Sequence, residues 1–375
     1  MGTPRSIVFC RYDDITHEAR SQEELACLER LGEVTFVSYA RPLNAASSTK
    51  CEIIAKRSYP AFLVASMKAI REVAPDVVFL HDNYCAPLIP FSRKKCPDSK
   101  IAYDMSELYI GRRGPGLAGM KSGMLMRCEL RHLRDADVVL AANSERALIA
   151  RGYYGLRDTP IVFDNVHRID DPCDMDAAAR FKGEIGEGDF VIVYAGGLPS
   201  ARSRGVLPLL RAVAETPGCT LLIAGKGHPD DPLLKQLPSN GGRVAHVGML
   251  DRGALRALYS LADLNAVMFG MSSVNDIFCA SGKQWEGLFE GVPLLAGPNP
   301  PLQRICRDEG IGVYAERSDV EEYKRCIAEA IKRKAELRGE ARRCAESVRY
   351  ESRLDRLTRE LEVRLDACAE RGAGR

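Results

Sequence analysis

Short apolar runs rich in valine and isoleucine recur along the chain, and a longer amphipathic or polar stretch separates each run from the next. The first set is SIVFC, EVTFVS, DVVFL, KIAYD, DVVLAAN and PIVFDN; the second, after about residue 188, is DFVIVYAGG, CTLLIAG, RVAHVG, LNAVMFG, VPLLAG and GVYA. Such runs suit strands that are buried on both faces of a parallel sheet, and the stretches between them have the length of helices. The pattern predicts an α/β protein with two tandem doubly wound, Rossmann-like domains.

The chain length of 375 residues also favours two domains, because a single hydrophobic core seldom serves more than about 250–300 residues. A polar stretch with Pro and Gly separates the two sets of runs. We therefore expect a first domain over 1–168, a linker over 169–188 and a second domain over 189–345. A charged helix is expected over 346–370. Four leucines share one stripe of it at helical spacing, which predicts packing against another element: Leu354, Leu357, Leu361 and Leu365.

The charges nearly balance, with a formal net charge of +2. A general nucleic-acid binder would show a clearly basic field, so no nucleic-acid partner is expected. The 13 cysteines form no C-x-x-C pair and no Cys/His cluster at zinc spacing, which is typical of reduced thiols in a cytoplasmic protein. No apolar run approaches the roughly 20 residues that cross a bilayer, and the N-terminus lacks a signal-peptide core. A cytoplasmic location is therefore expected.

Ligands of doubly wound domains bind at the carboxyl ends of the strands. The first such loop of the second domain, AGGLPSARSRG, has Gly196 and Gly197, which let the backbone approach a ligand, and Arg202 and Arg204, which can reach an anion. A turn with solvated arginines is the alternative. The loop does not spell G-x-G-x-x-G, and no acidic residue follows at the end of the next strand. A nicotinamide dehydrogenase is therefore not expected.

The stretch SGKQWEGLFEGVPLLAG, residues 281 to 297, predicts a short helix followed by a buried strand. Ser281 and Gln284 fit a capping box, which would place Gly282 and Lys283 in the first turn. The backbone N–H groups of a first turn form a ready site for phosphate, and Lys283 adds a full charge.

Two carboxylates, Glu286 and Glu290, lie one turn apart on the same predicted helix. We expect Glu286 to accept hydrogen bonds from the sugar hydroxyls of a nucleotide. An ordinary ion pair with Lys283 is the alternative. Glu290 is expected to meet solvent or a nearby basic side chain.

Four stretches of the second domain resemble, in order, the donor half of a GT-B glycosyltransferase, in particular glycosyltransferase family 4: YAGGLPSARSRGVLPLLRAVAE, LLIAGKG, VAHVGML and SGKQWEGLFEGVPLLAG. In the first domain PDVVFLHDNY, KIAYDMSELY, ADVVLAANSERALI and PIVFDNV follow the order of that family. The resemblance implies the GT-B architecture, with the terminal helix crossing back to the first domain. It also implies a hexosyltransferase of polysaccharide biosynthesis, which moves a sugar with retention from a nucleoside-diphosphate sugar to an acceptor hydroxyl on a glycan or lipid-linked intermediate.

The resemblance also implies a role for single residues. Glu286 would be the second glutamate of the E-x7-E signature and would hold the donor ribose. Arg204 and Lys283 would stabilise the charge of the leaving diphosphate, and both are catalytic candidates. The donor site that it implies consists of Gly196, Gly197, Arg202, Arg204, Gly225, Lys226, Val247, Gly248, Met249, Ser281, Gly282, Lys283 and Glu286. No metal or other cofactor is implied, since the D-x-D at 174 to 176 lies in the predicted linker, where a helix cap is expected.

Three positions depart from the family pattern. Phe278 occupies the place of the first glutamate of E-x7-E. Gly197 stands where the family often has an arginine, unless Arg202 substitutes for that arginine. Ser106 stands where relatives often have a histidine. A catalytically inactive GT-B subunit is therefore one alternative. The nucleotide-sugar 2-epimerases share the architecture and are another, although they need several acids and histidines around the sugar and this chain has six histidines.

Four residues at predicted strand ends of the first domain are expected to bind the acceptor: His81, Asp82, Ser106 and Glu107. His81 is also a catalytic candidate, with a hydrogen-bonded structural histidine as the alternative. Residues 117–134 mix Met and Leu with Lys121, Arg127, Arg131 and Arg134. Such a segment could rest on an anionic membrane surface; a core-packed helix with a solvated basic edge is the alternative.

Overall fold

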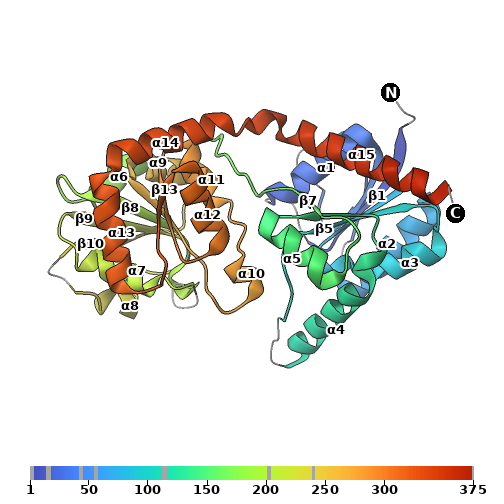
Figure 1. Cartoon of the computed structure of the whole chain (residues 1–375), viewed down its shortest axis with the longest axis horizontal. Coiled ribbons are helices and arrows are strands. Elements are labelled where there is room, and N and C mark those ends of the chain that lie inside the picture. Colours follow the sequence, from blue (N-terminus) through green and yellow to red (C-terminus); the bar gives the residue numbers. More distant parts are fainter. Residues whose placement is uncertain are drawn as a thin grey trace. The chain divides into compact units, whose positions relative to one another are not determined.

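The computed structural model describes residues 4–13, 18–41, 45–54, 58–111, 116–200, 204–238 and 241–373. It divides the chain into two compact units, residues 1–165 with 350–375, and residues 166–349. Each unit contains one parallel sheet with helices packed against it (Figure 1). The predicted architecture of two doubly wound α/β domains is confirmed.

The sheet of the first unit has seven parallel strands in the order β3-β2-β1-β4-β5-β6-β7. Its strands are β1 (Arg5–Arg11), β2 (Gly32–Ser38), β3 (Lys50–Ile53), β4 (Val77–His81), β5 (Lys100–Met105), β6 (Val138–Ala141) and β7 (Ile161–Val162). The sequence predicted all of these except β3. That strand lies at the sheet edge and is mostly exposed, so it lacks the apolar run that marks a central strand. The strand order reverses between β1 and β4, which makes this the topological switch point.

The helices of the first unit are α1 (Ala19–Leu31), α2 (Tyr59–Val73), η1 (Asn83–Cys85), α3 (Leu88–Lys95), α4 (Gly116–His132), η2 (Leu133–Asp135), α5 (Ser144–Tyr154), η4 (Tyr350–Ser352) and α15 (Arg353–Ala373). Helices α1 and α15 share an apolar cluster with Ile7 and Phe9 of β1. The leucine stripe of the terminal helix is confirmed, because Leu357, Leu361 and Leu365 are buried in this cluster and Leu354 packs against it. The terminal segment therefore belongs to the first unit.

The sheet of the second unit has six parallel strands in the order β10-β9-β8-β11-β12-β13. They are β8 (Phe190–Ala195), β9 (Cys219–Ala224), β10 (Arg243–Gly248), β11 (Leu264–Val267), β12 (Leu294–Ala296) and β13 (Gly312–Tyr314), all at predicted runs. Alternate residues of β8 serve opposite faces. Ile192 and Tyr194 join the cluster with helices α7 (Leu207–Ala214) and α13 (Val320–Lys332), whereas Val191 and Val193 join that with α6 (Met175–Lys182) and α9 (Arg252–Leu261).

The remaining helices of the second unit are η3 (Leu198–Ser200), α8 (Pro232–Lys235), α10 (Val274–Ile277), α11 (Lys283–Phe289), α12 (Pro300–Glu309) and α14 (Lys334–Ser347). Residues 169–188, expected as a linker, lie within this unit and include α6, whose Ala177 and Phe181 are core residues. The expected helix cap is confirmed: Asp174 accepts hydrogen bonds from the backbone N–H groups of Asp176 and Ala177. Among the described residues, none of the helices combines the length and apolar character that crossing a bilayer demands.

Candidate functional site

The carboxyl ends of β8, β9 and β10 approach one another in the second unit through glycines. Gly225, after β9, donates its backbone N–H to the carbonyl of Gly248 at the end of β10, at 2.8 Å. Gly225 has φ +146°, and a Cβ there would lie 2.7 Å from the carbonyl carbon of Gly196. Real Cβ atoms do not approach backbone so closely, so these three strand ends require glycine at this point.

The predicted donor residues around these glycines are adjacent in space. A Cβ on Gly197 would lie 3.1 Å from the carbonyl oxygen of Lys226, and Gly248 has φ +88° with open space beside it. Val247 is partly buried, whereas Met249 is 69% exposed. The structure therefore gathers three predicted loops at one edge of the sheet, where Gly196, Gly197, Gly225 and Gly248 are partly exposed.

Two side chains that the sequence did not single out brace this edge. His246, in β10, makes a 2.9 Å hydrogen bond through Nε2 to the carbonyl of Gly225. Asn299 is fully buried; its Oδ1 accepts from Phe269 N–H at 3.0 Å and its Nδ2 donates to the Asp276 carbonyl at 3.0 Å. Asn299 thus ties the loop after β11 to the loop after β12. Its position directly after the predicted strand VPLLAG was the only sequence signal for it.

Arg204 lies immediately before Gly205, which has φ +71° and precedes α7. Its guanidinium stacks over the ring of Phe269 at 4.8 Å and makes no ion pair with a residue that the structure describes. Phe269 follows β11, so the arginine is held beside the strand that neighbours β8. An arginine held by an aromatic face and lacking an acid partner can still bind an oxyanion. Arg202 lies outside the described residues.

The predicted capping box at α11 is wrong. The helix begins at Lys283, its N-cap is Gly282 in αR geometry, and no side chain caps it. Ser281 Oγ accepts from the N–H of Lys283 at 3.3 Å and not from that of Gln284. A capping box needs an extended N-cap residue, and the αR geometry of Gly282 moves the helix start one residue beyond Ser281. The ring of His167 lies against Gly282, which leaves no room for a larger residue there.

The two carboxylates near α11 have different partners. Glu290 pairs with Arg256 Nε at 2.8 Å, which confirms the expected basic neighbour. Glu286 accepts a long hydrogen bond, 3.4 Å, from the hydroxyl of Tyr259. Among the described residues, Glu286 and Lys283 form no ion pair. Helix α11 approaches β11 closely because Gly287 packs on Asn265, whose Nδ2 donates to the carbonyl of Lys283 at 2.8 Å.

In the first unit, His81 ends β4 and is only 1% exposed. Its Nδ1 lies 2.7 Å from Glu24 Oε2 and 3.3 Å from Asp104 Oδ2. Burial, followed by the charge of Arg11, holds the pKa of His81 well below its usual value. This geometry matches the structural histidine that we kept as the alternative, and the burial opposes direct contact with a substrate.

Arg20 and Asp104 form the centre of this buried network. Arg20 donates through Nε and Nη2 to the two oxygens of Asp104, at 2.8 and 2.6 Å. Burial alone would raise the pKa of Asp104, but the charge and hydrogen bonds of Arg20 hold it well below its usual range. Burial, then the charge of Asp104, raises the pKa of Glu24 well above its usual value. The ligand atoms of Glu24, His81 and Asp104 lie within 4.8 Å of one another, yet the Arg20 guanidinium already supplies the cation, so this donor set does not fit a metal ion.

Asp82, next after β4, is a backbone outlier with φ +69° and ψ +167°. Few residues other than glycine adopt this region, at a cost of about 1–3 kcal/mol. Its carboxylate accepts from the N–H of Asn83 at 2.6 Å and from the hydroxyl of Tyr109 at 2.9 Å. Burial raises its pKa to about 6 despite these hydrogen bonds. Asp82 is thus a strained, partly exposed carboxylate at the topological switch point of the sheet.

Ser106 and Glu107, the other predicted acceptor residues, follow β5 and share one partner. Arg146 of α5 donates to the carbonyl of Ser106 at 2.5 Å and lies 3.5 Å from the carboxylate of Glu107. Arg146 is 3% exposed, whereas the Glu107 side chain is 45% exposed. The buried guanidinium of Arg146 therefore holds the carboxylate of Glu107 in place, while the Glu107 side chain remains partly open to solvent.

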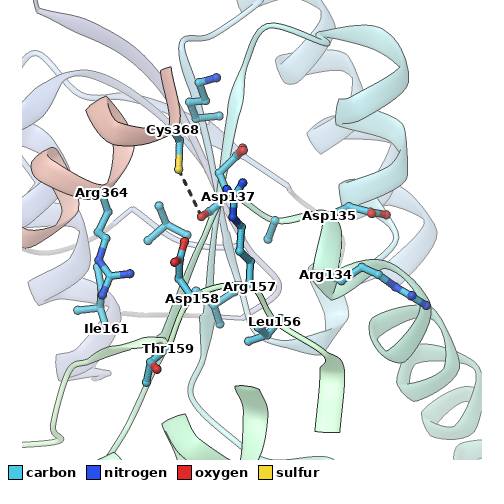
Figure 2. Close-up of a pocket in the computed structure, with 14 residues that line it drawn as sticks. Arg134, Asp135, Asp137, Leu156, Arg157, Asp158, Thr159, Ile161, Arg364 and Cys368 are labelled. Carbon is cyan, nitrogen blue, oxygen red and sulfur yellow. Dashed lines mark hydrogen bonds between the residues drawn. The ribbon is translucent and has the colours of Figure 1, made fainter. Parts of the chain in front are cut away.

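A cavity of about 330 Å³ lies at the opposite, amino-terminal ends of β5 and β6 and contains none of the predicted site residues (Figure 2). Arg157, Asp158 and Ile161 line it together with Arg364 and Cys368 of α15. The thiol of Cys368 donates to the carbonyl of Asp137 at 3.6 Å (Figure 2). Ligands of doubly wound sheets bind at the carboxyl ends of the strands, so this cavity is separate from the candidate site.

The sequence missed most of the buried polar network of the first unit. Arg20 and Glu24 are four residues apart in a segment that reads as an ordinary amphipathic helix. Their burial depends on the carboxylate of Asp104, which lies 84 positions after Arg20 in the sequence. The one available signal was the acidic residue at the end of the predicted strand KIAYD.

No protein-family model matches the sequence, and a search of the curated proteins gives no match. Solved structures do match. Sucrose-phosphate synthase from Thermosynechococcus elongatus has a TM-score of 0.69 at 15% identity, covering 98% of this chain and 100% of its own. HepE from Anabaena in complex with UDP has 0.70 at 14%, covering 96% and 100%. A presumed UDP-N-acetylglucosamine 2-epimerase from Listeria monocytogenes has 0.53 at 13%, covering 91% of each chain. These similarities show that the chain has the GT-B fold.

Proposed function

We propose that this protein is a glycosyltransferase that moves a hexose from a nucleoside-diphosphate sugar to an acceptor hydroxyl, with retention of configuration. The observation that carries the proposal is the meeting of three glycine strand ends, at Gly196, Gly225 and Gly248. Arg204, held over Phe269 after the strand that neighbours β8, forms no ion pair with a described residue. Glycine backbone and an arginine together suit a diphosphate. HepE, which shares the fold, has been solved with UDP and with UDP-glucose.

The chemistry requires that charge growing on the leaving diphosphate be stabilised. Arg204 and Lys283 supply that charge in the proposal, Gly197 and Lys226 border the diphosphate, and Glu286 accepts from the ribose. Neither Arg204 nor Lys283 is ion-paired with a described residue, so both can turn to a ligand. No metal or other cofactor is part of the proposal, because these cations can do that work.

The acceptor hydroxyl, on a glycan or lipid-linked intermediate, is assigned to Asp82, Ser106 and Glu107. Asp82 carries most weight, because its strained backbone at the switch point marks a position where function commonly overrides local stability. His81 has a structural role in the proposal: its contacts with Glu24 and Asp104 stabilise the carboxyl ends of β4 and β5.

The proposal places the protein in the cytoplasm, in polysaccharide biosynthesis, with peripheral contact to an anionic membrane. Helix α4 supports the contact: Met120 is 66% and Met124 67% exposed, and Arg127 and Arg131 are exposed on the same outward face.

Incubation with UDP-, GDP- and ADP-sugars tests the proposal against both alternatives. Release of the nucleoside diphosphate on adding an acceptor extract supports a transferase, an epimerised nucleotide sugar supports the 2-epimerase, and binding without turnover supports an inactive subunit. The variant Arg204→Gln should abolish release, whereas Arg211→Gln, on the neighbouring helix α7, should retain it. Equal activity of the two variants would remove Arg204 from the site.

A further inference from the structure

Three tyrosines surround a lysine ammonium at the switch point of the first unit. Lys121 Nζ lies 4.4 Å from the ring centroid of Tyr59, 5.0 Å from that of Tyr84 and 5.3 Å from that of Tyr12. Tyr12 follows β1, Tyr84 lies in η1 after β4, and Tyr59 begins α2. We call Tyr12, Tyr59 and Tyr84 the tyrosine cage. Since β1 and β4 flank the reversal of strand order, the cage occupies the place where such sheets bind ligands.

The cage is built as one aromatic unit. The ring centroids of Tyr12 and Tyr84 are 4.7 Å apart, and those of Tyr12 and Tyr59 are 5.1 Å apart. Tyr59 also donates its hydroxyl to the carbonyl of Tyr84 at 3.0 Å. Such contacts fix the rings, and the rings in turn fix the ammonium of Lys121.

Lys121 does not belong to the basic outer edge of α4 that the sequence predicted. Lys121, Leu125 and Glu129 follow one another at intervals of four residues and so share one face of the helix. Leu125 is 5% and Glu129 1% exposed, so this is the inward face. Lys121 therefore points its charge toward the sheet edge.

Within the described part of the chain, no acidic side chain pairs with the Lys121 ammonium. Among the residues that the structure describes, Lys121 forms no ion pair and no hydrogen bond; its only contacts of this kind are with the three rings. Aromatic faces attract a cation but leave the three N–H donors of an ammonium unsatisfied. A partly buried, pre-positioned ammonium of this kind is an incomplete anion site.

We propose that Lys121 binds a phosphate group of the acceptor, so that the acceptor is phosphorylated close to the hydroxyl that receives the sugar. This inference rests on the proposed function. Lysine binds phosphate as a point charge, whereas a planar carboxylate is better matched by the fork of an arginine. The phosphate could belong to a soluble sugar phosphate or to a lipid headgroup, and the same ammonium would serve either.

The test measures binding to the full chain saturated with UDP, so that the nucleotide site is already filled. Trp285 is the only tryptophan and lies on α11 of the second unit, so its fluorescence reports UDP binding independently. Absence of UDP binding would count against the proposed function; UDP binding with no effect of Lys121 would count against this inference alone.

Calorimetry with inorganic phosphate and glucose 6-phosphate, with glucose as the neutral control, provides the first arm. We expect Lys121→Met to weaken binding of the phosphorylated probes about tenfold, the scale of one charged contact, and Lys94→Met, the same loss of charge at the exposed end of α3, to leave it unchanged. Tyr59→Leu, which keeps the lysine but opens the cage, should also weaken binding and serves if Lys121→Met fails to fold.

Sedimentation with phosphatidylcholine vesicles, with and without phosphatidylglycerol, provides the second arm. If binding of glucose 6-phosphate depends on Lys121, the acceptor is a soluble sugar phosphate. If only binding to vesicles with phosphatidylglycerol depends on Lys121, the acceptor phosphate belongs to a lipid. Equal losses for Lys121→Met and Lys94→Met would overturn the inference. So would a Lys121→Met variant of lower melting temperature with unchanged binding in both arms, because the cage would then only fasten α4.

Discussion

Glu290 is paired with Arg256 at 2.8 Å, and Glu286, one turn earlier, has no such cation among the residues that the structure describes. Like charges at this spacing on a helix repel one another, and Arg256 offsets that repulsion at Glu290. The carboxylate of Glu286 is thereby available to a ligand. This asymmetry is what the proposed ribose role of Glu286 requires, and it gives Glu290 a partner within the protein.

Glu286→Ala should weaken nucleotide binding by roughly 10- to 100-fold, the effect of losing hydrogen bonds to a charged group. Glu290→Ala should leave the affinity unchanged, because its charge is satisfied within the protein. Titration with UDP and GDP, followed by Trp285 fluorescence, measures both variants. Negligible effects of both on both nucleotides would remove the ribose role from Glu286.

Gly225→Ala should destabilise the second unit by roughly 2–4 kcal/mol, because its Cβ would strike the carbonyl carbon of Gly196 at 2.7 Å. Gly248→Ala is the matched control. It also has positive φ but open space around it, so only backbone strain of about 1–2 kcal/mol is expected. Urea unfolding monitored by Trp285 compares the two. Equal losses would mean that the strand ends separate easily and are not held in contact.

The sequence predicted the central strands because parallel strands buried on both faces must be apolar throughout, as Val191, Ile192 and Val193 are. Strand β3 was not predicted, because it pairs with β2 on one side only and its residues are mostly exposed. The start of α11 was misplaced by one residue, since Ser281 offers a cap that the backbone at Gly282 does not use. Local pattern cannot report this choice, because it is made by the αR geometry of Gly282, against which the ring of His167 packs.

The candidate site was predicted to a similar extent. Glycine-rich strand ends can be identified from the sequence, because glycine after a buried strand has a local meaning. The surroundings of His81 could not be predicted from the sequence, because Arg20, Glu24 and Asp104 come from separate segments of the chain. Burial of a charged side chain is decided by its partner, and partners are set by the fold.

Asp82→Gly should be more stable than Asp82→Ala by about 1–2 kcal/mol, because glycine adopts φ +69° and ψ +167° without steric cost. Both variants lose the carboxylate and its hydrogen bonds, so their difference isolates the backbone strain. Urea unfolding followed by circular dichroism measures it. We expect both to lose sugar transfer equally. Greater stability of the alanine variant would show that the backbone at this position is unstrained.

Glu129 gives the first unit a pH dependence of known sign. The carboxyl is 1% exposed and accepts from the hydroxyls of Tyr103 at 2.6 Å and Tyr154 at 2.9 Å. Burial raises its pKa from the ordinary value of 4.5 to about 7. The folded state therefore holds a proton that the unfolded state has released, and this stabilisation is full below pH 4.5 and lost as pH rises through 7. The loss amounts to about 3 kcal/mol.

Glu129→Gln keeps an acceptor for the two tyrosines but does not titrate, so its stability should lack this decline. Unfolding in urea at intervals from about pH 5 to pH 8, across the window set by these pKa values, should show wild type losing about 3 kcal/mol relative to the variant. The variant should therefore be the more stable protein at the alkaline end. Parallel pH profiles would mean that Glu129 is already ionised at the acid end, with the two tyrosine hydroxyls fully compensating its burial.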